Sequence, residues 1–468
     1  MLVLAALLLG AVAHARAPEY DEAYSIFLTA GDARPAWPAG VFRAGDVRAR
    51  FSGQASPWQI ARDLRQGDVH PPLYFWALEY WRRLVGPSWF AARLLSVGFA
   101  VAALALVAWI AEASAIPPGA AIMVTLLSYG FAYTGIVARG FALAQLLNLA
   151  GVALILAAVK THDRRLAFAG GVVLSAASFA NYLAIFIGCA VMLWLARFYR
   201  RLLLPASLGL LILLPLDFYF FIGQKAAHAK QFAAFSLRHA AALLVKDFGA
   251  AMFGGLPVYA GHFGKPVALA LGLLFMLCAG MAMLRLNRRT CLFALAALAP
   301  SCGLLALGLV FDNTPIEIRY LAFSMPFVGL FFAALPRPLL LVLASVESAG
   351  IIGLAFAPAT MQPQGRAAVA ATDDATPNTL VLLPFGNDGV GVPGPFIEAA
   401  PDDMRIELVR GAVPDLAAEN RVILAAVTPD AASRAAVQSL ALSLAANAWH
   451  PDPPLPLLLT FTRNCNPN

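Results

Sequence analysis

Repeated apolar runs constrain the fold of this chain more than any other feature. A helix that crosses a bilayer needs roughly 20 mostly apolar residues, and about eleven runs of this kind follow one another along the sequence, several of them short. Of the 468 residues, 60% are hydrophobic and only 13% are charged. The pattern predicts a polytopic α-helical membrane protein, because helices satisfy their own backbone hydrogen bonds inside the bilayer.

The first run, residues 2–13, has two interpretations. Residues 14–17 resemble the small-residue cleavage site of a signal peptide, but a retained first helix gives a consistent orientation for the later spans. The other expected spans are residues 89–111, 117–137, 141–159, 166–180, 183–198, 202–222, 266–284, 291–311, 321–335 and 339–356.

Basic residues in short loops predict the orientation of these spans. With the N-terminus inside, the loops that become cytoplasmic all carry Lys or Arg: 160–165, 197–201, 285–289 and 336–338. This is the arrangement that the positive-inside rule requires. The net charge of +7 is therefore attributed to membrane insertion, and no nucleic acid partner is predicted.

Two long loops, residues 18–88 and 223–265, are then expected on the outer face. The second is rich in basic residues, which can attract anionic headgroups or form a rim that binds phosphate, and an amphipathic helix is expected between residues 231 and 253. The other polar residues gather on the same side, and one outer polar cavity would explain this. They are Asp21, Glu22, Asp68, His70, Arg139, Asn181, Tyr182, Asp217, Asp312, Glu317 and Arg319, the last directly before Tyr320.

The composition changes after the last apolar run. Residues 1–357 are expected to form the membrane domain, residues 358–378 a linker, and residues 379–468 a small α/β domain on the outer face. Within this domain, strands are predicted at 379–384, 405–409 and 421–427, and a helix at 429–446.

Two adjacent carboxylates, Asp21 and Glu22, follow the first run by a few residues. A carboxylate at the membrane surface can take a proton from an acceptor hydroxyl. The same residues would also favour the start of a helix over residues 23–30 by capping it. On these two residues alone, the cap is the better interpretation.

The motif at residues 68–72, DVHPP, is more specific. Its prolines suit the first turn of a helix, where a missing N–H costs nothing, and Asp68 can cap that helix. An aromatic helix over residues 73–81 is expected to follow and to lie at the membrane interface. Asp68 and His70 would then lie at a helix N-terminus, where anions bind.

Arginines at the outer ends of spans are candidates for phosphate binding. Arg139 and Arg319 can each pair with a phosphate more favourably than with apolar protein. Either can equally be an interfacial anchor or the partner of Asp217.

Together these residues resemble the GT-C glycosyltransferases, most closely the family 39 protein O-mannosyltransferases and the related aminoarabinose transferases. The resemblance covers about residues 1–335 and rests on short motifs. These are Asp21-Glu22, Asp68-Val69-His70-Pro71-Pro72-Leu73, Arg93 in Ala91-Ala92-Arg93-Leu94-Leu95, and Arg319-Tyr320.

The resemblance implies an inverting hexosyl or pentosyl transferase of the bacterial inner membrane. Its donor would be a sugar on a polyprenyl phosphate, and its acceptor a hydroxyl of a protein, lipid or glycan on the periplasmic side. Asp21, with Glu22 beside it, would be the catalytic carboxylate. The groups that would bind the donor are Asp68, His70, Arg139, Asp217, Lys225, Arg319 and Tyr320. No metal is assigned, although Asp21, Glu22 and His70 would also suit a divalent cation, which the spacing does not require.

The chain departs from the family in two motifs. Tyr74-Phe75 stands where the mannosyltransferases usually have Gly-Lys, and His70 stands where the aminoarabinose transferases often have lysine, which puts lipid A as the acceptor in doubt. No loop has room for the β-trefoil insert of the eukaryotic enzymes. The alternative function is a lipid or solute transporter, which would predict paired charges at the bilayer midplane and broken helices in two repeated halves; the sequence shows neither.

Overall fold

The chain folds into two units, each built from separate stretches of sequence. The computed structural model describes residues 1–32, 37–224, 233–356, 363–384, 393–409, 413–428 and 431–463. The first unit combines Met1–His14, Ala61–Ala77 and Ala92–Phe356. The second combines Ala15–Ile60, Leu78–Ala91 and Ala357–Asn468.

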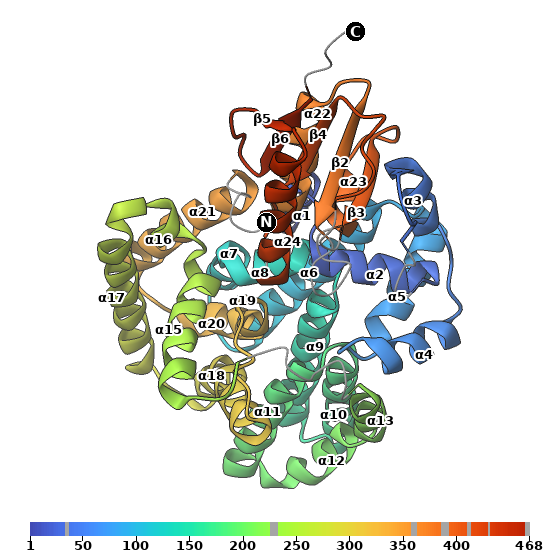
Figure 1. Cartoon of the computed structure of the whole chain (residues 1–468). Coiled ribbons are helices and arrows are strands. Elements are labelled where there is room, and N and C mark those ends of the chain that lie inside the picture. Colours follow the sequence, from blue (N-terminus) through green and yellow to red (C-terminus); the bar gives the residue numbers. More distant parts are fainter. Residues whose placement is uncertain are drawn as a thin grey trace, which may run out of the picture. The chain divides into compact units, whose positions relative to one another are not determined.

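Apolar helices make up the first unit (Figure 1). By length and composition, five are able to cross a membrane, or up to seven if each of two bent pairs is one span. The predicted polytopic helical fold is thus confirmed, whereas the count of about eleven spans stays a prediction. The five are α6 (Trp89–Ala113), α9 (Phe141–Thr161), η2 with α17 (Gly261–Met283), α18 (Arg288–Phe311) and α21 (Arg337–Phe356).

Two pairs of apolar helices are each bent at a short break, which the sequence does not indicate. α7 (Pro118–Leu127) and α8 (Tyr129–Ile136) meet at an angle of 70°. α12 (Arg200–Leu210) and α13 (Leu214–Gly223) meet at 44°, where Pro215 in the first turn of α13 has no backbone N–H to continue the earlier helix. The absence of broken helices therefore cannot be used as evidence against a transporter for this chain.

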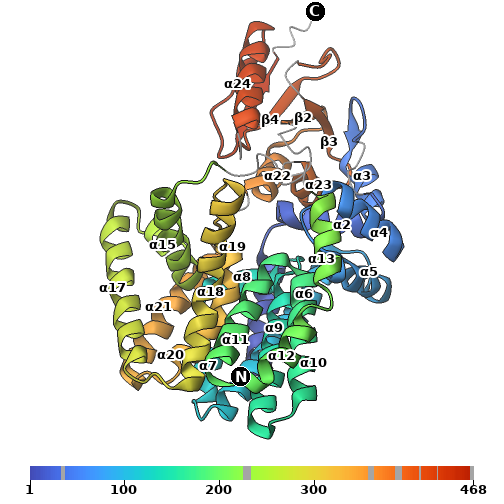
Figure 2. The same cartoon turned by 90° about the horizontal axis from the view of Figure 1, so that it is seen from below.

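Glycines allow α10 (Arg164–Ala180) to pack closely against α12, and both views show the two helices side by side (Figure 2). A Cβ on Gly171 would lie 2.0 Å from the carbonyl oxygen of Ala206 in α12, so only glycine fits there. The remaining helices of this unit are α1 (Leu2–Ala15), η1 (Tyr182–Ala184), α11 (Ile185–Phe198), α15 (Leu237–Phe253), α16 (Leu256–Tyr259), α19 (Ile318–Leu321), η3 (Ala322–Ser324) and α20 (Met325–Phe332). α4 (Pro57–Gly67) and α5 (Leu73–Val85) contribute residues to both units.

A six-stranded sheet forms the centre of the second unit, in the order β1-β3-β2-β4-β6-β5. β3, β2 and β4 are parallel, and the other pairs are antiparallel. The strands predicted at 379–384 and 405–409 have those bounds, and the third ends at residue 425. The strands are β1 (Phe42–Arg43), β2 (Thr379–Pro384), β3 (Arg405–Val409), β4 (Arg421–Ala425), β5 (His450–Pro451) and β6 (Leu458–Thr462).

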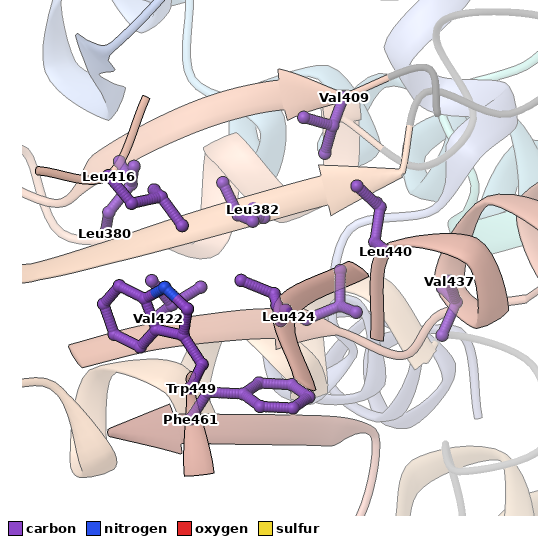
Figure 3. Close-up of a cluster of buried hydrophobic side chains, with 11 residues drawn as sticks. Leu380, Leu382, Val409, Leu416, Val422, Leu424, Val437, Leu440, Trp449 and Phe461 are labelled. Carbon is purple, nitrogen blue, oxygen red and sulfur yellow. The ribbon is translucent and has the colours of Figure 1, made fainter. Parts of the chain in front are cut away.

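The core of this unit lies between the sheet and α24 (Ala431–Ala446), where Leu440 of the helix faces Leu382 and Leu424 of the strands (Figure 3). In β2 and β4 the contributing residues alternate along the strand, as expected for one face of a sheet. The helix predicted at 429–446 is confirmed from Ala431, and residues 429–430 lie outside the described part of the chain. The buried cluster consists of Leu380, Leu382, Val409, Leu416, Val422, Leu424, Val437, Leu440, Leu444, Trp449 and Phe461.

Two elements of the second unit differ from expectation. Most of the predicted linker, residues 358–378, is occupied by α22 (Pro363–Asp374), an alanine-rich helix. β1 comes from the 18–88 loop and pairs with β3, with Phe42 opposite Ile406. The first long loop therefore supplies an edge strand to the C-terminal sheet. It also supplies α2 (Tyr20–Ala30) and α3 (Ala44–Phe51), while α23 (Pro393–Ala399) follows β2.

Candidate functional site

The motif at residues 68–72 forms a short loop between α4 and α5 in the first unit. α5 begins at Leu73, directly after the prolines, so the predicted aromatic helix is confirmed. Asp68 Oδ1 accepts a hydrogen bond from the Val69 backbone N–H at 2.6 Å and lies 2.8 Å from His70 Nδ1. The carboxylate therefore binds its own loop, and the prediction that it caps the following helix is wrong.

Arg139 reaches the same loop from the turn between α8 and α9. Its Nη2 lies 3.8 Å from Asp68 Oδ2 and 3.3 Å from His70 Nδ1. The guanidinium carbon lies 5.6 Å from the centre of the Phe75 ring, which also packs against His70. Residues that are about 70 positions apart thus form one cluster, with Asp68 and Arg139 buried and His70 partly buried, which we call the Asp68–His70–Arg139 cluster.

Burial and charge determine the protonation states in this cluster. Burial alone would raise the pKa of Asp68, but Arg139, His70 and the Val69 N–H together hold it below its usual value. Burial and the Arg139 charge lower the pKa of His70, and Asp68 offsets this only in part. At neutral pH the cluster therefore holds an ionised Asp68 and a neutral His70 beside the Arg139 guanidinium. If His70 Nδ1–H donates to Asp68, its Nε2 remains an acceptor.

Acidification is expected to destabilise the protein through His70. Because the pKa of His70 is lowered by folding, the unfolded chain takes up this proton first as the pH falls through about 6.5, and Asp68 follows only in stronger acid. The thermal unfolding midpoint should therefore fall between about pH 7.5 and about pH 5.5. His70→Gln, which does not titrate, should show a smaller fall. An equal fall in both proteins would place the sensitive group elsewhere.

Gln224, directly after α13, connects this loop to η1. Its amide NH₂ donates to the backbone oxygens of Leu64 at 3.1 Å and His70 at 2.9 Å. Its Oε1 accepts a hydrogen bond from the Tyr182 hydroxyl at 3.0 Å. Sequence reasoning missed Gln224, because a single glutamine at the end of an apolar run carries no pattern.

Asp217 lies in α13 and pairs with Ser178, not with Arg139. The Ser178 hydroxyl donates to its Oδ2 at 2.5 Å, while Oδ1 is buried and has no hydrogen-bond partner among the described residues. The Tyr182 hydroxyl interacts electrostatically with both Asp217 and Asp68. A mostly apolar cavity of about 620 Å³ lies beside Tyr182 and Asp217. Its lining is Ser178, Tyr182, Ile185, Leu211, Leu214, Pro215, Asp217, Phe218 and Phe221.

Arg319 and Tyr320 lie in α19 of the same unit. Arg319 Nε is 2.5 Å from Glu317 Oε2, and its guanidinium carbon lies 5.3 Å from the centre of the Tyr320 ring. The Tyr320 hydroxyl also interacts electrostatically with Arg139. Tyr320 therefore lies within electrostatic range of Arg139. Lys225 lies outside the described residues.

Asp21 and Glu22 lie in the first turn of α2, in the second unit, and both are buried. The sequence predicted that one of them caps this helix, and that prediction is wrong. Glu19 is the capping residue, and Glu22 completes a capping box by accepting the Glu19 backbone N–H at 3.0 Å. Glu22 therefore has a defined structural contact at the start of the helix that carries Asp21.

The first unit thus presents the Asp68–His70–Arg139 cluster, which hydrogen bonds through Gln224 connect to Tyr182 in the lining of an apolar cavity. A guanidinium binds phosphate oxygens in a fixed, forked geometry, and an apolar cavity suits a hydrocarbon chain. Across the described ranges, no group of three or more His, Cys, Asp or Glu side chains is placed to hold a metal ion. This chemistry favours an amphiphile with an anionic head.

Comparison with known proteins identifies the fold. No family model matches the chain, and no curated protein matches its sequence. The structure of ArnT from Cupriavidus metallidurans bound to undecaprenyl phosphate is similar, with 14% identity, a TM-score of 0.53, and coverage of 99% of this chain and 98% of ArnT. The apo structure of the same protein gives 13% identity, a TM-score of 0.51, and coverage of 98% and 96%. The chain therefore has the GT-C-like glycosyltransferase fold that its motifs predict, with several apolar helices and a small C-terminal sheet.

Proposed function

We propose that this protein is a membrane glycosyltransferase that moves a sugar from a polyprenyl phosphate to an acceptor hydroxyl, with inversion. The observation that carries the proposal is the Asp68–His70–Arg139 cluster, linked through Gln224 and Tyr182 to an apolar cavity. The fold likeness to a protein that binds undecaprenyl phosphate supports the same donor class. The proposed location is a bacterial inner membrane, with the site on the periplasmic side.

Arg139 is proposed to bind the donor phosphate and to stabilise the charge that develops on it as it leaves. Asp68 holds Arg139 and His70 in place, but its charge offsets that of Arg139. The donor phosphate therefore needs a further cation or donor group, and Arg319, Tyr320 and Lys225 are the candidates. A carboxyl group does not favour a phosphate, so Asp217 is proposed to accept a hydrogen bond from a sugar hydroxyl instead.

Asp21 is proposed as the general base. Its carboxylate would take the proton of the acceptor hydroxyl while the acceptor oxygen bonds to the anomeric carbon. The bond between that carbon and the phosphate oxygen breaks, and the polyprenyl phosphate leaves with the electron pair. Attack from the face opposite the phosphate inverts the anomeric centre. Glu22 supports this role by fixing the start of α2.

Filling the cavity is expected to weaken the use of long-chain donors. Ile185→Trp places a large ring in the space that a hydrocarbon chain would occupy, and a loss of about 1.4–2.8 kcal/mol of chain binding should raise the KM for an undecaprenyl-phosphate sugar about 10- to 100-fold. A donor with only two isoprene units should be affected less. Leu193→Trp, on the exposed side of the same helix, is the control. Equal effects on long and short donors would argue against a chain in this cavity.

A transporter is the second candidate, because two pairs of apolar helices are bent at a short break and α21 carries a buried carboxyl group. Neither carboxyl oxygen of Glu347 has a hydrogen-bond partner in the described part of the chain. Ionisable groups inside a membrane span often mark transport pathways. The two functions are separated by following a labelled donor in sealed vesicles, since a transporter moves it intact and a transferase consumes it.

A further inference from the structure

Arg82 contacts the ends of two helices in the second unit. It extends from α5 and is buried. Its Nη1 donates to Thr29 Oγ1 at 2.7 Å and to the Ile26 carbonyl at 3.4 Å, and its Nη2 donates to the Phe51 carbonyl. Thr29 and Ile26 lie near the C-terminal end of α2, and Phe51 ends α3. The Phe51 carbonyl is the last of α3 and lacks a helical partner, and Thr29 lies in the last turn of α2, so one guanidinium connects the ends of the two helices.

The charge of Arg82 persists in this buried position. Burial lowers the pKa of Arg82 to about 10, and Glu79 opposes that effect. The side chain is therefore a cation at neutral pH, as the carbonyl contacts require.

Arg48 forms the same kind of contact between α3 and α23. Its Nη1 donates to the carbonyls of Ile397 at 3.3 Å and Glu398 at 3.1 Å, and also to that of Ala400. Its Nη2 pairs with the carboxylate of Asp402. These acceptors lie at the C-terminal end of α23, so Arg48 joins a helix of the first long loop to a helix of the C-terminal fold.

The sheet reinforces this connection. β1 pairs with β3, the Ala44 N–H donates to the Met404 carbonyl at 3.0 Å, and the Gly45 N–H donates to the Asp402 carbonyl at 3.0 Å. A Cβ on Gly45 would lie 3.0 Å from Asp402 Oδ1, so the start of α3 lies directly against this segment. The start of α3 and its Arg48 side chain are therefore both fixed by the C-terminal fold.

We infer that the C-terminal α/β fold positions the helix that carries Asp21, with Arg48 joining α23 to α3 and Arg82 joining α3 to α2. This inference rests on the proposed role of Asp21 as the base. The Glu19–Glu22 capping box closes the first turn of α2 locally, whereas Arg82 connects the last turn of α2 to other elements of the unit, so Arg82 is the side chain that holds this helix in place. Arg48 and Arg82 are positioning residues, because neither is assigned a contact with donor or acceptor.

A small displacement of the base has a large kinetic effect. A misplacement of about 1 Å can cost about 100-fold in rate. Arg48→Met and Arg82→Met should therefore lower kcat about 10- to 100-fold while changing the KM for the donor by less than about 2-fold. Arg82→Lys keeps the charge and should recover part of the loss.

Hydrogen exchange of the α2 amides and kcat, both measured on the full-length protein, test the inference. Each arginine variant is made in the wild type and in Asp21→Asn. Arg421→Met is the matched control, because Arg421 binds Asp374 at 2.7 Å and lies 3.6 Å from Asp452 within the same C-terminal fold. We expect faster exchange in α2 for Arg48→Met and Arg82→Met but not for Arg421→Met. We also expect their kcat losses to disappear in the Asp21→Asn background, because residues that act through Asp21 are not additive with it.

Unchanged exchange in α2, or an undiminished kcat loss in the Asp21→Asn background, would overturn the inference. So would an equal effect of Arg421→Met, which would indicate a general loss of the C-terminal fold. Failure of the proposed function is a separate result. In that case Asp21→Asn would itself keep the wild-type kcat, while the exchange data would still show whether the arginines hold α2.

Discussion

Replacing Asp21 by asparagine is expected to lower kcat for sugar transfer by about 10²- to 10⁴-fold, the usual contribution of a general base. Asparagine has the same shape but cannot take the acceptor proton. Asp21 lies in the first turn of α2, where a negative charge in a buried position adds up to about 2 kcal/mol of stability, so the unfolding midpoint of the variant is measured beside its rate. Initial rates at saturating donor measure the effect, and the unfolding midpoint checks the fold.

Glu22→Gln provides the comparison, since it removes the neighbouring charge from the same helical turn. Glutamine can still accept the Glu19 N–H in a capping box, so α2 should persist. We expect a loss of kcat much smaller than that of Asp21→Asn, with a similar unfolding midpoint. If Glu22→Gln had the larger kinetic effect, Glu22 and not Asp21 would be the base.

Replacing Arg139 by glutamine is expected to lower kcat by about 10²- to 10³-fold, because preorganised donors that stabilise developing charge contribute that much. The variant should also be less stable. Removing one partner of a buried ion pair typically costs about 3–5 kcal/mol, and the cost here should be at the low end because the Val69 N–H still donates to Asp68 and the His70 ring stays 2.8 Å from it. Kinetics with an undecaprenyl-phosphate sugar and thermal unfolding measure the two effects.

The double variant Arg139→Gln with Asp68→Asn separates the two effects. Neutralising both partners leaves no unpaired buried charge, so much of the lost stability should return. The rate should stay low, because the donor phosphate still lacks its cation. Recovery of the rate together with the stability would show that Arg139 only supports the loop.

Local sequence patterns predicted several elements of this fold well. In the strands predicted at 379–384 and 405–409, apolar residues either alternate with polar ones or follow one another, and turn residues flank them. The bounds of both strands in the structure are the predicted ones. β1 could not be predicted, because two residues carry no periodicity and its partner lies more than 350 positions away. The helix in the predicted linker was missed because proline, glutamine and threonine obscured its alanines.

The candidate site was also predicted only in part. The motif at 68–72 marked Asp68 and His70 as unusual, but the meeting with Arg139 depends on how α8 and α9 pack against the loop. The sequence allowed Asp217 to pair with Arg139, and the structure shows that Asp217 pairs with Ser178 instead. Side chains that contact each other across distant helices are set by tertiary packing, and local patterns do not carry that information.

Consumption of the donor is the most direct test of glycosyl transfer. The purified protein is placed in lipid nanodiscs with undecaprenyl phosphate that carries one labelled hexose or pentose, and each such donor is tested in turn by mass spectrometry. We expect one donor to lose its sugar and to yield an equal amount of undecaprenyl phosphate in the wild type, with little in Asp21→Asn. If the folded protein binds these donors but leaves all of them intact, or moves them across sealed vesicles unchanged, glycosyl transfer is contradicted.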